Sequence, residues 1–171
     1  GEHHPWIEKQ IEVVKEICSH FHEEIASFYN IFSPISYLKR WFRTDQSRGD
    51  QVMADFIKED PETVAYVLDV IAGDISTLSR RLIQEAGVEG IYFSTQQVQD
   101  ERVTQEEYRK VIEPSNIAVL EAANEAGGIN ILHICGFEGA SNEVELFKDF
   151  PAHFINWEKH HDGLSLAEGR K

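Results

Sequence analysis

Basic side chains, cysteines and long hydrophobic runs are all scarce in this sequence. The 16 Lys and Arg stand against 30 Asp and Glu, which gives a formal net charge of −14. Such a surface repels phosphate groups, so we expect binding neither to nucleic acid nor to membranes. No apolar run approaches the roughly 18 residues of a membrane span, and no secretory signal is recognisable. Two cysteines, Cys18 and Cys135, are too few for a disulfide scaffold, so we expect a cytoplasmic protein.

The hydrophobic pattern alternates between helix-like and strand-like segments along the 171 residues. Length and composition predict one domain with a core of its own. Apolar runs predict strands at 27–33, 88–95, 129–135 and 152–157, and helices are predicted at 5–26, 50–58, 61–86, 104–126 and 142–150, with a loop or short helix at 35–49. Asp60 before Pro61, and Thr104 before Glu107, are helix-start signals. This alternation predicts an α/β fold whose parallel strands are buried on both faces.

Residues 129–136, INILHICG, hold two soft-metal ligands at the end of an apolar run. His133 and Cys135 are two positions apart, so on a strand both side chains point to the same face. Imidazole nitrogen and thiolate sulfur suit zinc, and a catalytic zinc usually takes three protein ligands and one open position. The pair therefore predicts a metal site that needs a further ligand. The alternative is that Cys135 packs as a small apolar residue and His133 hydrogen-bonds a neighbour.

Polar or aromatic side chains also lie at the carboxyl ends of the other predicted strands. In parallel α/β enzymes the site lies at the carboxyl ends of the strands. Those ends carry Ser33, Ser94, Thr95, Asn156 and Trp157. We predict that these residues bind substrate. The alternatives are a turn for Ser33, a loop start for Ser94 and Thr95, and a core position for Trp157.

Two further groups of polar residues are candidates for the site. Lys39, Arg40, Arg43 and Arg48 could hold an anionic substrate, or they could form a solvated charged face. The segment 160–162, His-His-Asp, could supply a metal ligand or an acid–base group, or it could be an exposed loop. The sequence leaves these alternatives open.

Three strings, GVEGIYFSTQ (87–96), INILHICG (129–136) and HFINWE (153–158), resemble the uroporphyrinogen decarboxylase family in their order and separation. The resemblance runs over residues 28–171. It implies a TIM (β/α)8 barrel in which the predicted strands are strands four to seven of eight. A complete barrel has about 250 residues. We therefore expect residues 1–171 to form a single partial barrel domain, as a fragment or a truncated product.

The resemblance implies one of two activities. The methyltransferase branch holds zinc with a His-x-Cys pair and a distant Cys, and transfers a methyl group from a corrinoid protein to a thiol. His133 and Cys135 match that pair, and the third ligand is expected beyond Lys171. The decarboxylase branch removes carboxylates from a porphyrinogen, in porphyrin and heme biosynthesis, without metal or cofactor. That branch carries Phe-Asp-Ser-Trp where this chain has Phe-Ser-Thr-Gln at 93–96, and a Tyr at the position of Arg40.

The sequence leads us to expect the zinc-thiolate methyltransferase, with a small-molecule thiol as substrate and His133 and Cys135 as metal ligands. The first alternative is uroporphyrinogen decarboxylation, with Arg40 and Arg43 neutralising a polycarboxylate. The second is a non-catalytic half-barrel. Four parallel strands with both edges open leave backbone groups unpaired, so this alternative predicts a homodimer or higher homo-oligomer.

Overall fold

A parallel sheet forms the centre of the described chain, which comprises residues 3–21, 24–42 and 48–169 of the computed structural model. The strands described there are β1 (Phe28–Phe32), β2 (Gly90–Thr95), β3 (Ile131–Ile134) and β4 (Phe154–Trp157). They lie in the order β1-β2-β3-β4, and each neighbouring pair is parallel. The predicted α/β fold, with parallel strands that alternate with helices, is confirmed.

The helices begin where the sequence signals place them. Asp60 caps the helix that starts at Pro61, since its side chain accepts from the Thr63 amide, and Thr104 and Glu107 form a complete capping box. The helix predicted to end at Gly87 does so, but its last turn is a π-helix. The helical elements are α1 (Pro5–Phe21), α2 (Pro34–Trp41), α3 (Arg48–Glu59), α4 (Pro61–Arg81), η1 (Leu82–Ala86), α5 (Gln105–Glu107), η2 (Tyr108–Ile112), α6 (Glu113–Glu125), η3 (Val144–Phe147) and α7 (Lys159–Asp162).

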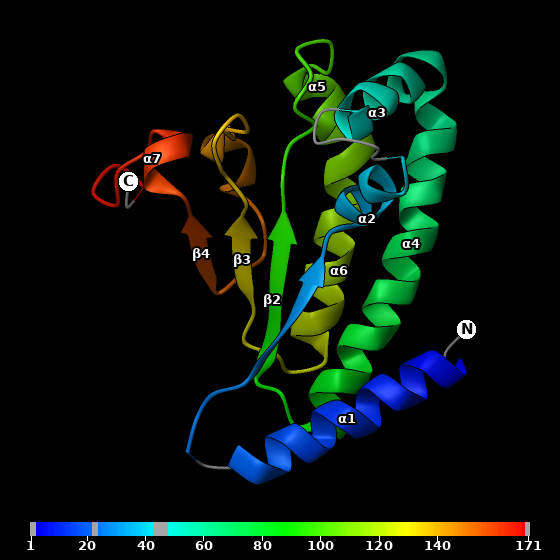
Figure 1. The fold of residues 1–171 in the computed structure, drawn as a ribbon, viewed down its shortest axis with the longest axis vertical. Helices are drawn as coiled ribbons and strands as arrows, with labels where there is room; N and C mark the ends of the chain where they lie inside the picture. Colours follow the sequence, from blue (N-terminus) through cyan, green and yellow to red (C-terminus); the bar gives the residue numbers. More distant parts are fainter. Residues whose placement is uncertain (1–2, 22–23, 43–47, 170–171) are drawn as a thin grey trace.

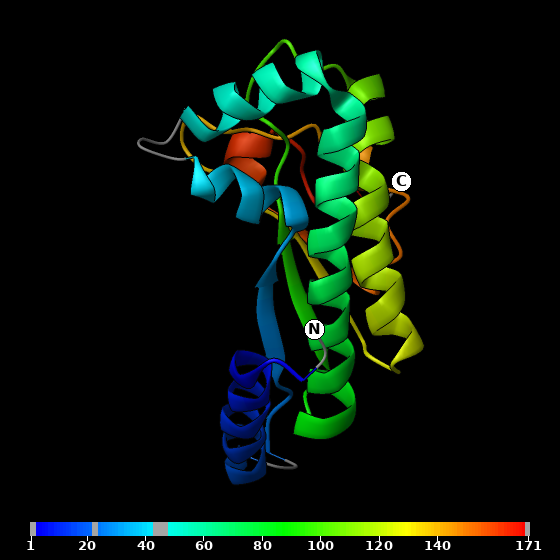
Figure 2. The same cartoon turned by 90° about the vertical axis from the view of Figure 1, so that its right-hand side faces the viewer.

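One face of the sheet is covered by helices. Helices α4 and α6 pack against each other and lie together on that face (Figure 1, Figure 2). The strand residues beneath them are buried and form the core: Ile31, Ile91, Phe93, Leu132 and Ile134. The opposite face is more open, and Phe154 in β4 is 59% exposed. The expectation that both faces are buried is therefore wrong for the described residues, because α4 and α6 add their layer to one face.

The outer strands β1 and β4 each have a strand neighbour on one side only within the described ranges. Closure of these edges by a second copy, and hence the homo-oligomer, stays a prediction. None of the helices described combines the length and the hydrophobicity that a bilayer crossing needs.

Asn130 ties the three strands β2, β3 and β4 together at their amino ends. It is fully buried, and its Oδ1 accepts a hydrogen bond of 2.9 Å from the Ile91 amide in β2. Its backbone carbonyl accepts from the amides of His153 and Phe154 at 3.0 and 3.2 Å. Beside it, a Cβ on Gly90 would lie 2.2 Å from the carbonyl oxygen of Ile129. The side chain and this close approach together fix how the strands are aligned.

We predict that Asn130→Ala lowers the free energy of unfolding by about 1–3 kcal/mol, because the Ile91 amide is left buried without an acceptor. Urea denaturation followed by circular dichroism measures the change. The matched control is Asn30→Ala, since Asn30 is an exposed asparagine in β1. Equal unfolding free energies for the two variants would contradict the role given to Asn130.

Candidate active site at the carboxyl edge of the sheet

The carboxyl ends of the strands point toward the end of the molecule where α2, α3 and α7 lie (Figure 1). The strand register aligns Phe32, Ser94, His133 and Asn156 in one row across the sheet. Residues in register share a face of the sheet. Along each strand these four positions are adjacent to core positions, so their side chains lie on the opposite, more open face. The register therefore brings together three of the residues predicted for the site.

His133 is held by its neighbours on both sides. Its Nδ1 lies 2.6 Å from Oδ1 of Asn156, and the Tyr92 hydroxyl donates to the same oxygen at 3.1 Å. The rings of Tyr92 and His133 are stacked, with their centroids 5.1 Å apart. An amide oxygen can only accept, so this contact requires a proton on Nδ1, and in the neutral ring the lone pair is then on Nε2. The imidazole can therefore act as a ligand or a base through Nε2.

Cys135 extends the ladder one step beyond β3, because its amide donates to the Thr95 carbonyl at 2.8 Å. Burial raises the pKa of the half-buried Cys135 thiol, and the nearby carboxylate of Asp162 raises it further. The charge of Lys39 and a hydrogen bond from Ser94 act in the opposite direction. The thiol therefore keeps its proton at higher pH than an ordinary cysteine.

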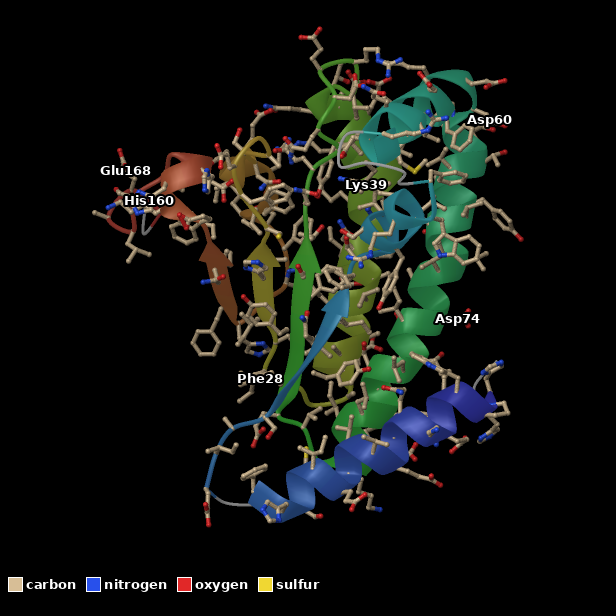
Figure 3. All side chains as sticks on the ribbon, in the orientation of Figure 1. Phe28, Lys39, Asp60, Asp74, His160 and Glu168 are labelled. Atoms are coloured by element: carbon tan, nitrogen blue, oxygen red, sulfur yellow. The ribbon has the colours of Figure 1, made fainter. Side chains whose placement is uncertain are left out.

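Asp162 reaches the end of β3 because Gly136 has no side chain. A Cβ on Gly136 would lie 2.4 Å from Oδ1 of Asp162. The amides of Asn142 and Glu158 donate to the two carboxylate oxygens at 2.8 and 3.2 Å and fix the group in place. Of the candidate segment 160–162, Asp162 thus lies at the site, whereas His160 is exposed on α7 beyond β4 (Figure 3).

A cavity of about 410 Å³ opens beside Cys135 and Ser94. Lys39 lies at its wall, near the carboxyl ends of the strands (Figure 3), and forms a buried ion pair of 2.5 Å with Asp50. Lys39 also donates to the side chain of Gln96, which in turn donates to the Cys135 carbonyl at 3.2 Å. This network fixes α2 and α3 to the end of β3.

Arg40 is the other basic residue of α2 at this cavity. Its guanidinium lies over the Phe32 ring, 5.1 Å from the centroid. Arg48 begins α3 and is exposed. Arg43, which was a candidate for the same role, lies outside the described residues.

Three predicted binding residues do not line this cavity, and each has structural contacts of its own. Ser33 is buried as the N-cap of α2, and its hydroxyl bonds Ser36. Thr95 is in register with core residue Ile134 on the helix-covered face. Trp157 is in register with Ile134 and so lies on the helix-covered face, and its indole donates to the Leu164 carbonyl at 2.8 Å. Their role in substrate binding stays a prediction.

Sequence reasoning missed Tyr92, Asp50 and Gln99 as residues of this region. Tyr92 is two positions before Ser94, so the alternation of β2 would have placed it on the same face. Asp50 accepts from the Gln99 amide at 2.7 Å and pairs with Lys39, but neither contact has a local pattern in the sequence.

His133 and Cys135 share one face, but they are only two ligands. Among the residues that the structure describes, no group of three or more His, Cys, Asp or Glu could hold a metal ion. A further ligand would have to come from outside these residues.

Comparison of the sequence with protein-family models gives no match, and comparison with curated proteins gives none either. The family resemblance therefore depends on the three strings of the sequence.

We predict opposite effects of two substitutions on the reactivity of Cys135. Asp162→Asn removes a neighbouring negative charge, so the thiol pKa falls and alkylation below that pKa becomes faster by roughly twofold or more. Ser94→Ala removes a hydrogen bond that favours the thiolate, so alkylation becomes slower. Iodoacetamide rates measured peptide by peptide in chelator-treated protein check both. Cys18 is the internal control, and shifts of the same sign at Cys135 would contradict the electrostatic account.

Proposed function

We propose that this chain is part of a (β/α)8 barrel similar to the uroporphyrinogen decarboxylase family and that the carboxyl edge of its sheet is the active site. The strand order and the strand–helix alternation support the barrel. The activity proposed is methyl transfer from a corrinoid protein to a small-molecule thiol at a zinc centre. One observation carries this proposal: Asn156 occupies Nδ1 of His133 and leaves Nε2 available, two positions from Cys135 on the same face.

The donor atoms at this edge suit zinc. Neutral imidazole nitrogen and cysteine sulfur are its usual ligands, and His133 is already oriented by a second partner, as ligating histidines generally are. Zinc, when bound, would lower the pKa of a thiol and supply a thiolate at neutral pH. The third ligand is expected beyond Lys171, as the family resemblance implies.

The residues of this chain would prepare that step. Asn156 and Tyr92 hold the imidazole, and Ser94 donates to the sulfur of Cys135. Because the raised pKa keeps Cys135 protonated, binding of a cation through the sulfur must release a proton, and affinity should rise with pH. The cavity beside Cys135 offers room for a small substrate.

We predict that the chelator-treated protein binds Co²⁺, a spectroscopic substitute for zinc, and shows a thiolate-to-cobalt charge-transfer band in the near ultraviolet. Cys135→Ser removes the band because it removes the sulfur ligand. His133→Gln weakens binding by roughly tenfold or more, since one of few ligands is lost.

The matched controls are Cys18→Ser and His160→Gln, which leave the band unchanged. Absence of the band from the unsubstituted protein, or its persistence in Cys135→Ser, would contradict the zinc proposal. Metal analysis of protein purified without chelator gives an independent measurement.

A second candidate function is porphyrinogen decarboxylation without metal. The specific observation in its favour is Arg40, which lines the cavity, stacks on Phe32 and has no carboxylate partner within the described residues. Its charge would attract a polycarboxylate to an otherwise strongly acidic protein.

The decarboxylase alternative predicts that a tetracarboxylate such as coproporphyrin binds and quenches tryptophan fluorescence. Arg40→Glu then weakens binding by roughly tenfold or more, because attraction at the cavity is replaced by repulsion. Arg80→Glu, on the exposed surface of α4, is the charge-matched control and leaves binding unchanged. Equal affinities of the two variants, or no binding at all, would leave the zinc-thiolate activity as the proposed function.

A further inference from the structure

Three neighbouring strands contribute one residue each to a small polar cluster on the open face. Tyr92 comes from β2, His133 from β3 and Asn156 from β4. Two donors converge on a single oxygen, since the Tyr92 hydroxyl and Nδ1 of His133 both contact Oδ1 of Asn156. The stacked Tyr92 ring restricts rotation of the imidazole from one side.

This arrangement selects one tautomer of the neutral imidazole. Were the proton on Nε2, the lone pair of Nδ1 would face the lone pairs of the amide oxygen at 2.6 Å, which is repulsive. With the proton on Nδ1, the same contact is a short hydrogen bond. The Tyr92 hydroxyl donates to the same oxygen at 3.1 Å, so it holds the Asn156 amide in place with its oxygen toward the ring.

The chemical identity of Asn156 matters as well. A carboxylate at this position would also accept from Nδ1, but it would place a negative charge next to the ring. The amide is neutral, so it orients the ring without adding a negative charge beside the imidazole.

We propose that Asn156 and Tyr92 are positioning residues that hold His133 as the Nδ1–H tautomer and so keep Nε2 unprotonated for a ligand or a proton. The purpose of this arrangement depends on the proposed function, but the tautomer itself does not. Neither residue needs to contact substrate for this role.

The test is the tautomer of His133 in the metal-free full chain, read from long-range ¹⁵N–¹H correlation spectra in alkaline buffer. His133→Gln assigns the signals. In the unsubstituted protein we expect Nδ1 to be of the protonated type and Nε2 of the unprotonated type. Asn156→Leu should shift the ring to the Nε2–H form or to a mixture, and Tyr92→Phe should cause a smaller shift in the same direction.

Two controls separate positioning from a merely structural effect. Asn156→Asp keeps an acceptor oxygen and should retain the proton on Nδ1, whereas Asn30→Leu changes an exposed asparagine on the same face and should leave the spectrum of His133 as it is. An Nε2–H tautomer in the unsubstituted protein, or an unchanged tautomer in Asn156→Leu, would overturn the proposal.

Cobalt titration of the same variants links the tautomer to ligation. Loss of an oriented partner typically weakens metal binding about 10–100-fold, and we expect a loss in this range for Asn156→Leu. If the tautomer depends on Asn156 but the protein binds no Co²⁺, the positioning role stands and the zinc function fails. If Co²⁺ binds through Cys135 but the tautomer does not depend on Asn156, the zinc function stands and the positioning role fails.

Discussion

The parallel register of β2, β3 and β4 is the constraint on which the candidate site depends. It places Ser94, His133 and Asn156 in one row. Because side chains alternate between faces, a shift of β4 by one residue would move Asn156 to the helix-covered face and break the contact with His133. The register is set at the other end of the strands, where buried Asn130 contacts both neighbours of β3. A residue remote from the site thus determines which groups meet there.

The buried Lys39–Asp50 pair has a comparable role for the cavity. A buried ion pair is weak evidence for stability, since the loss of hydration offsets much of the attraction, but removal of either partner leaves an uncompensated charge. Lys39 also donates to Gln96, which bonds the Cys135 carbonyl. The pair therefore holds α2 and α3 in a defined position relative to the end of β3. We infer that the ion pair serves mainly to position α2 and α3, rather than to raise the free energy of unfolding.

The sequence predicted what depends on local patterns. The four strands, the parallel α/β order and the helix starts at Asp60 and Thr104 follow from apolar runs and capping residues, which act over a few positions. It did not predict that Phe154 is exposed, because burial of a strand depends on which layers reach it. Nor did it find the contact of Tyr92 with Asn156 or the contact of Asp162 with the end of β3. The alternation of β2 places Tyr92 on the face of Ser94, but both contacts join residues from different parts of the chain, and no spacing rule names the partner.

The contacts of Cys135 bear on which chemistry this edge can support. Burial and the carboxylate of Asp162 both disfavour a free thiolate, so a mechanism that needs an unaccompanied sulfur anion would work against its surroundings. With a cation bound at the sulfur, the Asp162 carboxylate becomes favourable rather than unfavourable, because it then attracts the positive charge. The amides that hold Asp162 in place and the bare backbone of Gly136 keep this negative charge close to the sulfur. If the zinc proposal holds, the local electrostatics would favour a cation-bound thiolate over a free nucleophile.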